Sequence, residues 1–134
     1  MSKQKLQKPV RILVVEDHET LRETMETWLR EEFTDISIYT AVTGEEAVAK
    51  ASRLKPEIIL MDIRLPGISG IEAMREIFRR GIQTEVVIIT NHNEEIYWRD
   101  AKNAGARSFV LKRMMWDTLP AVLIQLMNIQ STSK

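Results

Sequence analysis

The sequence of 134 residues contains no cysteine, no excess of charge of either sign and no long apolar run. Without cysteine there is no disulfide framework, no thiolate zinc site and no thiol nucleophile, and a reducing compartment fits. Nineteen basic side chains balance nineteen acidic ones, so the positive charge typical of a nucleic-acid-binding domain is missing. The apolar runs are too short to cross a bilayer, and the N-terminus lacks the apolar block of a signal peptide. We therefore expect a cytoplasmic domain that binds neither membrane nor nucleic acid directly.

Residues 58–70 give the clearest indication of a binding site, because they run from an apolar segment through Asp62 into turn residues. The run from Ile58 to Met61 is typical of a strand buried on both faces, as in the middle of a parallel sheet. Asp62 follows where such a strand leaves the core, and ligands of open α/β sheets bind just beyond the carboxyl ends of the strands. Pro66 and Gly67 then predict a turn. Asp62 is therefore expected to point into a binding site.

Similar apolar segments alternate with amphipathic helical patterns along the chain. Strands are predicted at residues 10–15, 36–39, 58–61, 86–89 and 108–111, and helices around residues 21–33, 43–55, 71–78, 94–104 and 119–126. The last helix is expected to have Asp117 or Thr118 as its cap and Pro120 in its first turn. Right-handed crossovers then give an α/β fold with a five-stranded parallel sheet covered on both faces. Residues 1–9 are expected to be a disordered leader, 10–130 one folded domain and 131–134 a frayed tail.

Functional groups stand at the carboxyl ends of four of these strands: Glu16 with Asp17, Asp62, Thr90 and Lys112. Because a parallel sheet brings these ends to one edge, we expect the side chains to converge. Carboxylates are hard oxygen ligands of the kind that hold Mg²⁺, and a carboxylate beside Mg²⁺ can attack phosphorus to form an aspartyl phosphate. A lysine ammonium and a threonine hydroxyl would bind the phosphoryl oxygens. The set therefore predicts phosphoryl transfer.

The same segments resemble the receiver domain of bacterial two-component response regulators, over roughly residues 10–129. The resemblance rests on motifs in a fixed order: Val14-Val15-Glu16-Asp17, Leu60-Met61-Asp62 followed by Pro66-Gly67 and Ser69-Gly70, Ile88-Ile89-Thr90, and Ala104-Gly105-Ala106 leading to Phe109-Val110-Leu111-Lys112. It implies a flavodoxin-like sheet of order 2-1-3-4-5 with five helices on two faces. It also implies a signalling switch rather than a turnover enzyme, in which a sensor histidine kinase phosphorylates Asp62.

The resemblance further implies a role for each residue at the site. Ligands for Mg²⁺ would be Asp17, Asp62, the backbone carbonyl of Arg64 and, through water, Glu16. Thr90 and Lys112 would bind the phosphate, and Phe109 would be the switch aromatic whose rotamer follows Thr90. The face built from the fourth helix, the fifth strand and the fifth helix would then repack for a partner, and a homodimer through this face is one such contact.

Two positions depart from the family pattern. Arg113 follows Lys112, where the family usually has proline, often after a cis bond. A cis bond without proline would cost about 3 kcal/mol, so either this bond is trans or local contacts offset the strain. Asn91 stands after Thr90, where the family usually has a small residue, and it is expected to crowd the phosphodonor or the hydrolytic water.

Each site residue also has a simpler structural interpretation. These interpretations are a solvated loop aspartate for Asp62, a helix cap for Asp17, a strand terminus for Thr90, a surface lysine for Lys112 and core packing for Phe109. His18 and His92 lie beside the predicted site and suggest a zinc ligand or a general base, although surface histidines near a helix start are commoner. The aromatic and methionine side chains around 97–98 and 114–116 fit either an exposed partner surface or core packing.

Two other functions compete with the phosphorylation switch. An aspartyl-nucleophile phosphatase of the haloacid dehalogenase kind would need a second aspartate two residues after Asp62, where this chain has Arg64. A receiver-like scaffold that binds partners without phosphorylation is kept open by Arg113 and Asn91. Phosphorylation of the chain by a small phosphodonor would separate the switch from the scaffold.

Overall fold

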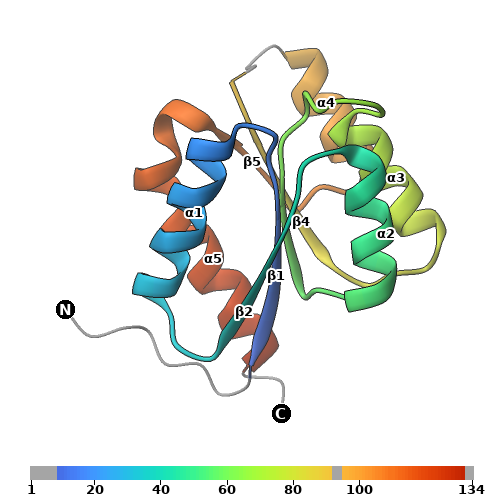
Figure 1. Cartoon of the computed structure of the whole chain (residues 1–134). Helices are drawn as coiled ribbons and strands as arrows, with labels where there is room; N and C mark the ends of the chain where they lie inside the picture. The colour runs from blue at the N-terminus through green and yellow to red at the C-terminus, as the bar shows by residue number, and fades with distance from the viewer. Residues whose placement is uncertain (1–8, 92–94, 132–134) are drawn as a thin grey trace.

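The computed structural model describes residues 9–91 and 95–131 of the chain. At its centre lies a sheet of five parallel strands in the order β2-β1-β3-β4-β5 (Figure 1). The strands are β1 Val10–Val15, β2 Ile36–Ala41, β3 Ile58–Met61, β4 Glu85–Thr90 and β5 Ser108–Leu111. The predicted sheet, its parallel direction and its strand order are therefore confirmed.

Helices cover both faces of this sheet. They are α1 Glu19–Glu32, α2 Gly44–Leu54, α3 Gly70–Arg79, α4 Glu95–Ala104 and α5 Met115–Ser131. In Figure 1, α1 and α5 lie on one side of the sheet, and α2, α3 and α4 lie on the other. This is the predicted flavodoxin-like arrangement. Within the described residues, none of the helices has both the length and the apolar composition required to cross a bilayer.

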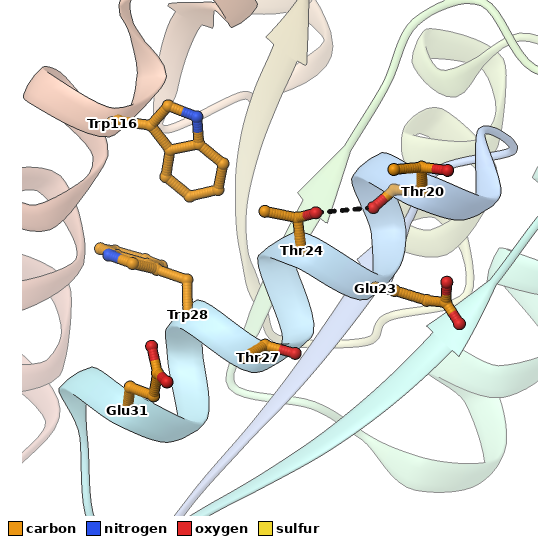
Figure 2. Close-up of a pocket in the computed structure, with 7 residues that line it drawn as sticks. All are labelled: Thr20, Glu23, Thr24, Thr27, Trp28, Glu31 and Trp116. Atoms are coloured by element: carbon orange, nitrogen blue, oxygen red, sulfur yellow. Dashed lines mark hydrogen bonds between the residues drawn. The ribbon is translucent and has the colours of Figure 1, made fainter.

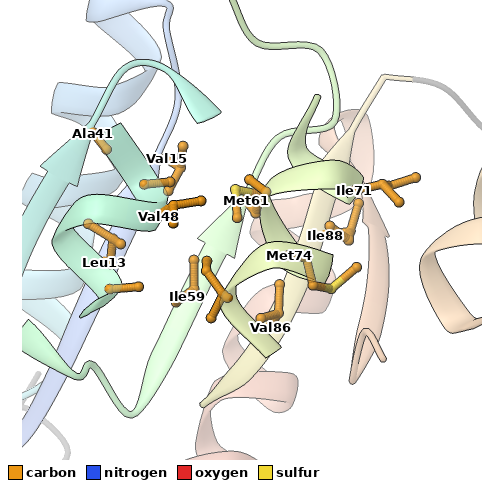
Figure 3. Close-up of a cluster of buried hydrophobic side chains, with 14 of the residues drawn as sticks. Leu13, Val15, Ala41, Val48, Ile59, Met61, Ile71, Met74, Val86 and Ile88 are labelled. Atoms are coloured by element: carbon orange, nitrogen blue, oxygen red, sulfur yellow. The ribbon is translucent and has the colours of Figure 1, made fainter. Parts of the chain in front are cut away.

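Alternate residues of the central strands face opposite layers, which explains why the strands are apolar throughout. In β3, Ile58 and Leu60 pack in the core shared with α1 and α5, whereas Ile59 and Met61 pack in the core shared with α2 and α3 (Figure 3). All four side chains are at most 1% exposed. Full burial of such a side chain stabilises the fold by about 1.5–3 kcal/mol. The strand that carries Asp62 is thus anchored from both sides.

Local hydrogen bonds fix the loop between β3 and α3. The hydroxyl of Ser69 accepts from the backbone N–H of Glu72 at 3.1 Å, and the carboxylate of Glu72 accepts from the backbone N–H of Ser69 at 3.2 Å. This pair forms a capping box. Gly67 has a φ of +79°, which glycine adopts without steric cost, and the N–H of Gly70 donates to the carbonyl of Ile63 at 2.8 Å. The chain is therefore held close to the end of β3 directly after Asp62.

The start of α5 differs from the prediction. The chain leaves β5 through a 3-10 turn, Lys112–Met114, and α5 begins at Met115, so neither Asp117 nor Thr118 caps it. Met115 is buried in the core and stands four residues before the buried Leu119, which extends the apolar stripe of the helix backward by one turn. Pro120 consequently lies inside the helix, and because proline has no N–H, the carbonyl of Trp116 lacks its usual partner four residues on.

The start of α4 lies partly outside the described residues. The helix is predicted to start at residue 94, which is not described, and the described helix begins at Glu95. The helix ends at Ala104, as predicted, because Gly105 has a φ of +110° and the N–H of Ala106 donates to the carbonyl of Ala101 at 2.9 Å.

Candidate functional site

The carboxyl ends of β1, β3 and β5 bring three charged side chains together. In the sheet Val15 pairs with Met61, so Glu16 and Asp62 leave neighbouring strands at the same level. The backbone N–H of Asp62 donates to the carbonyl of Val15 at 3.1 Å. From β5, Nζ of Lys112 lies 3.0 Å from Oδ2 of Asp62 and 2.9 Å from Oε1 of Glu16. The predicted convergence of these residues is therefore observed.

This ion pair is almost fully buried. The side chains of Lys112, Asp62 and Glu16 are 10%, 5% and 3% exposed, respectively. Removing a charge from water is costly, and a buried charge is tolerated when opposite charges and hydrogen bonds compensate it. One ammonium here faces two carboxylates, so the cluster retains a negative charge. A site of this kind attracts a second cation.

The two carboxylates have opposite pKa shifts. Burial raises the pKa of Asp62 above its usual range, and the hydrogen bond and charge of Lys112 only partly offset this effect. Burial also disfavours the charged form of Glu16, but hydrogen bonds from Lys112 and His18 more than compensate, so the pKa of Glu16 lies below its usual range. The pKa of Lys112 is raised: burial opposes its charge, and the hydrogen bonds to Glu16 and Asp62 outweigh burial. Lys112 therefore remains a cation.

Asp17 contributes a buried carboxylate oxygen to the site. Its Oδ1 is buried and accepts no hydrogen bond from the described residues, and Nδ1 of His18 is 3.6 Å away, beyond hydrogen-bond range. Ligand atoms of Glu16, Asp17, His18 and Asp62 lie within 4.8 Å of one another. A buried carboxylate oxygen without a donor is costly unless a cation occupies the space beside it. Hard oxygen donors suit Mg²⁺, so these residues fit such an ion.

His18, one of the two histidines predicted near the site, contacts Glu16. His18 is mostly exposed, but its backbone N–H and its Nδ1 lie 3.0 and 2.9 Å from Oε2 of Glu16. It therefore orients this carboxylate from the start of α1, a role that is consistent with its pKa being raised by the hydrogen bond to Glu16 and the charge of Asp17. His92 lies outside the described residues.

Thr90 and Arg64 lie at strand ends beside the cluster, whereas Phe109 lies within β5, three residues before Lys112. Thr90 is the last residue of β4, fully buried, and pairs in the sheet with Leu111, the residue before Lys112. The backbone N–H of Arg64 is 3.4 Å from Oδ1 of Asp62, which places this residue at the site, while the role of its carbonyl stays a prediction. Phe109 is half-buried, packs against the core shared with α2 to α4, and lines a cavity of about 140 Å³ between α4 and β5.

The two departures from the family pattern also have a place in the structure. The described residues contain no cis peptide bond, so Arg113 follows Lys112 in a trans 3-10 turn. This turn still directs Lys112 to Asp62. Asn91 is exposed and lines a hollow of about 610 Å³ beside the site, together with Lys112 and Arg113.

The aromatic and methionine residues at 97–98 and 114–116 include some that pack in the core and some that are exposed. Met115 is buried, whereas Met114, Trp116 and Trp98 are exposed by 47%, 41% and 46%. Tyr97 is partly buried, packs against the core, and its hydroxyl lies 3.4 Å from Nη2 of Arg64. The exposed tryptophans thus belong to the surface.

Two residues support the site through contacts that the sequence did not predict. Nη1 of Arg22 donates to the backbone carbonyl of Glu16 at 3.0 Å from the first turns of α1. Gly70 lies against the backbone of Asp62: a Cβ at this position would stand 2.0 Å from the carbonyl oxygen of Asp62. Both contacts depend on how α1 and α3 sit on the sheet, which a motif search does not reveal.

Gly70→Ala is therefore expected to disturb the end of β3. Because the methyl group meets backbone that cannot move aside easily, we expect the free energy of unfolding to fall by about 2 kcal/mol. Gly81→Ala is the matched control, since no atom lies within 4 Å of its added Cβ. It should cost only the strain of its φ of +78°, about 1 kcal/mol. Urea unfolding monitored by circular dichroism measures both values, and equal losses would contradict the close approach at Gly70.

Comparisons with known proteins agree with this geometry. The family model of the response regulator receiver domain matches residues 12–124. The response regulator GacA of Pseudomonas viridiflava is 36% identical over 107 residues, covering 77% of this chain and 48% of GacA. The transcriptional regulatory protein DegU of Brevibacillus brevis is 30% identical over 119 residues, covering 89% of this chain and 50% of DegU. The chain thus spans about half the length of these curated relatives.

Solved structures show the same similarity across the fold. The response regulator domain of Thermotoga maritima CheB superposes with a TM-score of 0.79 at 29% identity, covering 92% of this chain and 96% of that chain. The signal receiver domain of a putative Luxo repressor protein from Vibrio parahaemolyticus gives a TM-score of 0.82 at 27% identity, covering 90% and 91%. From the matched family model, the sheet order and the acidic cluster at the strand ends, the chain belongs to the receiver domains of two-component response regulators.

Proposed function

We propose that this chain is a phosphorylation-controlled switch that accepts one phosphoryl group on Asp62 from a sensor histidine kinase. The observation that carries the proposal is the buried cluster of Asp62, Lys112 and Glu16, beside an oxygen of Asp17 that accepts no hydrogen bond from the described part of the chain. A cluster with two buried carboxylates for one ammonium has little structural reason to exist without a ligand. A divalent cation and a phosphoryl group together would supply the missing charges.

Mg²⁺ would be held by Asp17, Asp62 and the backbone carbonyl of Arg64, with Glu16 acting through water. When bound, the ion neutralises charge on the phosphoryl oxygens during transfer. Asp62 then forms a bond from one carboxylate oxygen to phosphorus as the phosphorus–nitrogen bond to the donor histidine breaks. Lys112 holds the other oxygen of Asp62 in the described structure and would bind a phosphoryl oxygen afterwards. The chain thus supplies the acceptor, the groups that would hold Mg²⁺ and a lysine for the phosphoryl oxygens.

The switch would work through Thr90 and Phe109. A new dianion on Asp62 would draw the Thr90 hydroxyl and Lys112 toward it, and Phe109 would turn into the space that Thr90 leaves. The half-buried Phe109 already borders a cavity next to α4, so the ring has room to move. The face of α4, β5 and α5 would then bind a partner, and the exposed Ile96 and Trp98 on α4 favour a homodimer there.

Intact mass spectrometry after incubation with acetyl phosphate and Mg²⁺ tests the proposal. We expect a gain of one phosphoryl group, stable in acid and labile in base, and no gain when EDTA removes the metal. Absence of phosphorylation, under conditions in which a known receiver domain is modified, would leave the scaffold function instead. Repeating the assay with a phosphorylated histidine kinase distinguishes the kinase from small donors.

A further inference from the structure

The loop between β3 and α3, which follows Asp62, is also held by the start of α2. The backbone N–H of Ile68 in this loop donates to Oε2 of Glu45 at 3.2 Å, although the two residues are 23 positions apart in the sequence. Glu45 is exposed and lies in the first turn of α2, which packs beside α3 on the same face of the sheet (Figure 1). The phosphorylation chemistry proposed above does not involve Glu45.

Two glycines allow α2 and the loop to approach each other this closely. A Cβ on Gly44, the first residue of α2, would stand 2.5 Å from both Cγ1 and the carbonyl oxygen of Ile68. A Cβ on Gly67 would stand 2.2 Å from Oε1 of Glu45. The carboxylate of Glu45 therefore occupies the space beside Gly67, and its hydrogen bond to Ile68 belongs to a closely packed junction.

The position of Glu45 is itself fixed, because α2 is anchored at its start and along its inner face. The side chain of Thr43 caps the helix and accepts from the backbone N–H of Glu46 at 3.0 Å. Ala47 and Ala51 are fully buried in the core that α2 and α3 share with the sheet. Glu45 thus contacts the loop from a rigid support.

Arg64 lies between two points at which the loop is held. At one of them the carbonyl of Ile63 accepts from the N–H of Gly70 at 2.8 Å, and at the other the N–H of Ile68 is bound by Glu45. The backbone carbonyl of Arg64 is the ligand that this loop would give to Mg²⁺ in the proposed function. A segment that is already held in its bound conformation loses less conformational entropy when a ligand binds. The contact with Glu45 would therefore favour the binding of Mg²⁺.

We propose that Glu45 is a positioning residue for Mg²⁺. Its hydrogen bond to Ile68 holds the β3–α3 loop so that the carbonyl of Arg64 is in place before the ion binds. The inference rests on the cation site of the proposed function. It gives the start of α2 a part in setting the affinity of the chain for Mg²⁺, although α2 supplies none of the ligands proposed above.

Isothermal titration calorimetry of the full chain with Mg²⁺, without any phosphodonor, tests the proposal. We expect Glu45→Ala to weaken Mg²⁺ binding about threefold, which corresponds to the loss of one exposed hydrogen bond. Glu45→Gln should bind Mg²⁺ as the wild type does, because the amide oxygen still accepts from Ile68. In metal-free buffer, the amide hydrogen of Ile68 should exchange faster in Glu45→Ala than in the wild type, as measured by NMR, and Glu45→Gln should restore its protection.

Glu57→Ala is the matched control. Glu57 also accepts a backbone N–H from a distant segment, that of Arg11 at 2.6 Å, but it does so directly before β3, at the end of the strand opposite Asp62. Its carboxylate also pairs with the guanidinium of Arg11 at 2.8 Å. Glu57→Ala should therefore destabilise the fold at least as much as Glu45→Ala, as measured by urea unfolding, and yet bind Mg²⁺ with the affinity of the wild type.

Gly67→Ala tests the same junction from the side of the loop. Its methyl group would displace the carboxylate of Glu45, so this variant should also bind Mg²⁺ more weakly. In a Glu45→Ala background the same substitution has no carboxylate to displace, and its effect on Mg²⁺ affinity should be smaller. Such non-additivity is expected of residues in contact.

Three results would overturn the positioning role of Glu45. One is equal Mg²⁺ affinity of Glu45→Ala and the wild type. Another is a loss in Glu45→Gln as large as that in Glu45→Ala, which would assign the effect to charge and not to the hydrogen bond. The third is an equal loss in Glu57→Ala, which would assign it to general destabilisation. A wild type that binds no Mg²⁺ would refute the proposed cation site itself and this inference with it, so the two failures are distinguishable.

Discussion

Asp62→Asn is expected to gain no phosphoryl group from acetyl phosphate and Mg²⁺, under conditions in which the wild type gains one. The amide lacks the anionic oxygen that attacks phosphorus, and it is a weaker ligand for a divalent cation. The fold should survive the change. Lys112 keeps its contact with Glu16, and the substitution removes one of two buried carboxylates that share this single ammonium. Loss of phosphorylation would therefore report on chemistry and not on unfolding.

The matched control for this variant is Asp117→Asn. Asp117 is an exposed aspartate in the first turn of α5, outside the acidic cluster. The Asp117→Asn variant should be phosphorylated on Asp62 as fully as the wild type is, as judged by intact mass and by mapping of the modified peptide. Retention of the phosphate in Asp62→Asn, mapped to Asp17 for example, would remove Asp62 as the acceptor and require a different geometry for the site.

The positions of the site residues along the chain were predictable because they follow from strand topology. Continuous apolar runs mark strands that are buried on both faces, and the parallel direction brings their carboxyl ends to one edge. Asp62 and Lys112 could therefore be placed together without any contact information. That Lys112 contacts Glu16 as closely as Asp62 could not be predicted, because it depends on the 3-10 turn after β5 and on the side-chain conformation.

The start of α5 was mispredicted because a local rule competed with a tertiary one. Asp117, Thr118 and Pro120 together have the composition of a helix start. Burial of Met115 in the core nevertheless extends the helix backward, and the helix tolerates Pro120 in its interior. The contact between Trp28 and Trp116 could not be predicted for a related reason: the two residues come from helices far apart in the sequence, and only the packing of α1 on α5 brings their rings together (Figure 2).

Lys112→Met is expected to lower the free energy of unfolding by about 3 kcal/mol in metal-free buffer. Removal of one partner from a buried ion pair leaves the other charge uncompensated, and here two carboxylates, those of Glu16 and Asp62, lose their only ammonium contact among the described residues. Methionine keeps the apolar stem of the side chain, so the loss reports mainly on charge. Urea unfolding in the presence of EDTA measures this fall in the free energy of unfolding.

Lys50→Met gives the scale for an ordinary lysine. Nζ of Lys50 lies 3.1 Å from Oε2 of Glu46 on the half-exposed side of α2 and also donates to the carbonyl of Thr40, and pairs that are open to solvent contribute about 0–1 kcal/mol. If the cluster at the strand ends is a cation site, Mg²⁺ should restore part of the stability of Lys112→Met, since the ion takes over the neutralising charge, and should leave Lys50→Met unaffected relative to the wild type. A Lys112→Met variant as stable as the wild type in EDTA would mean that desolvation cancels the ion pair. In that case Lys112 would be kept at the site for the phosphoryl group alone.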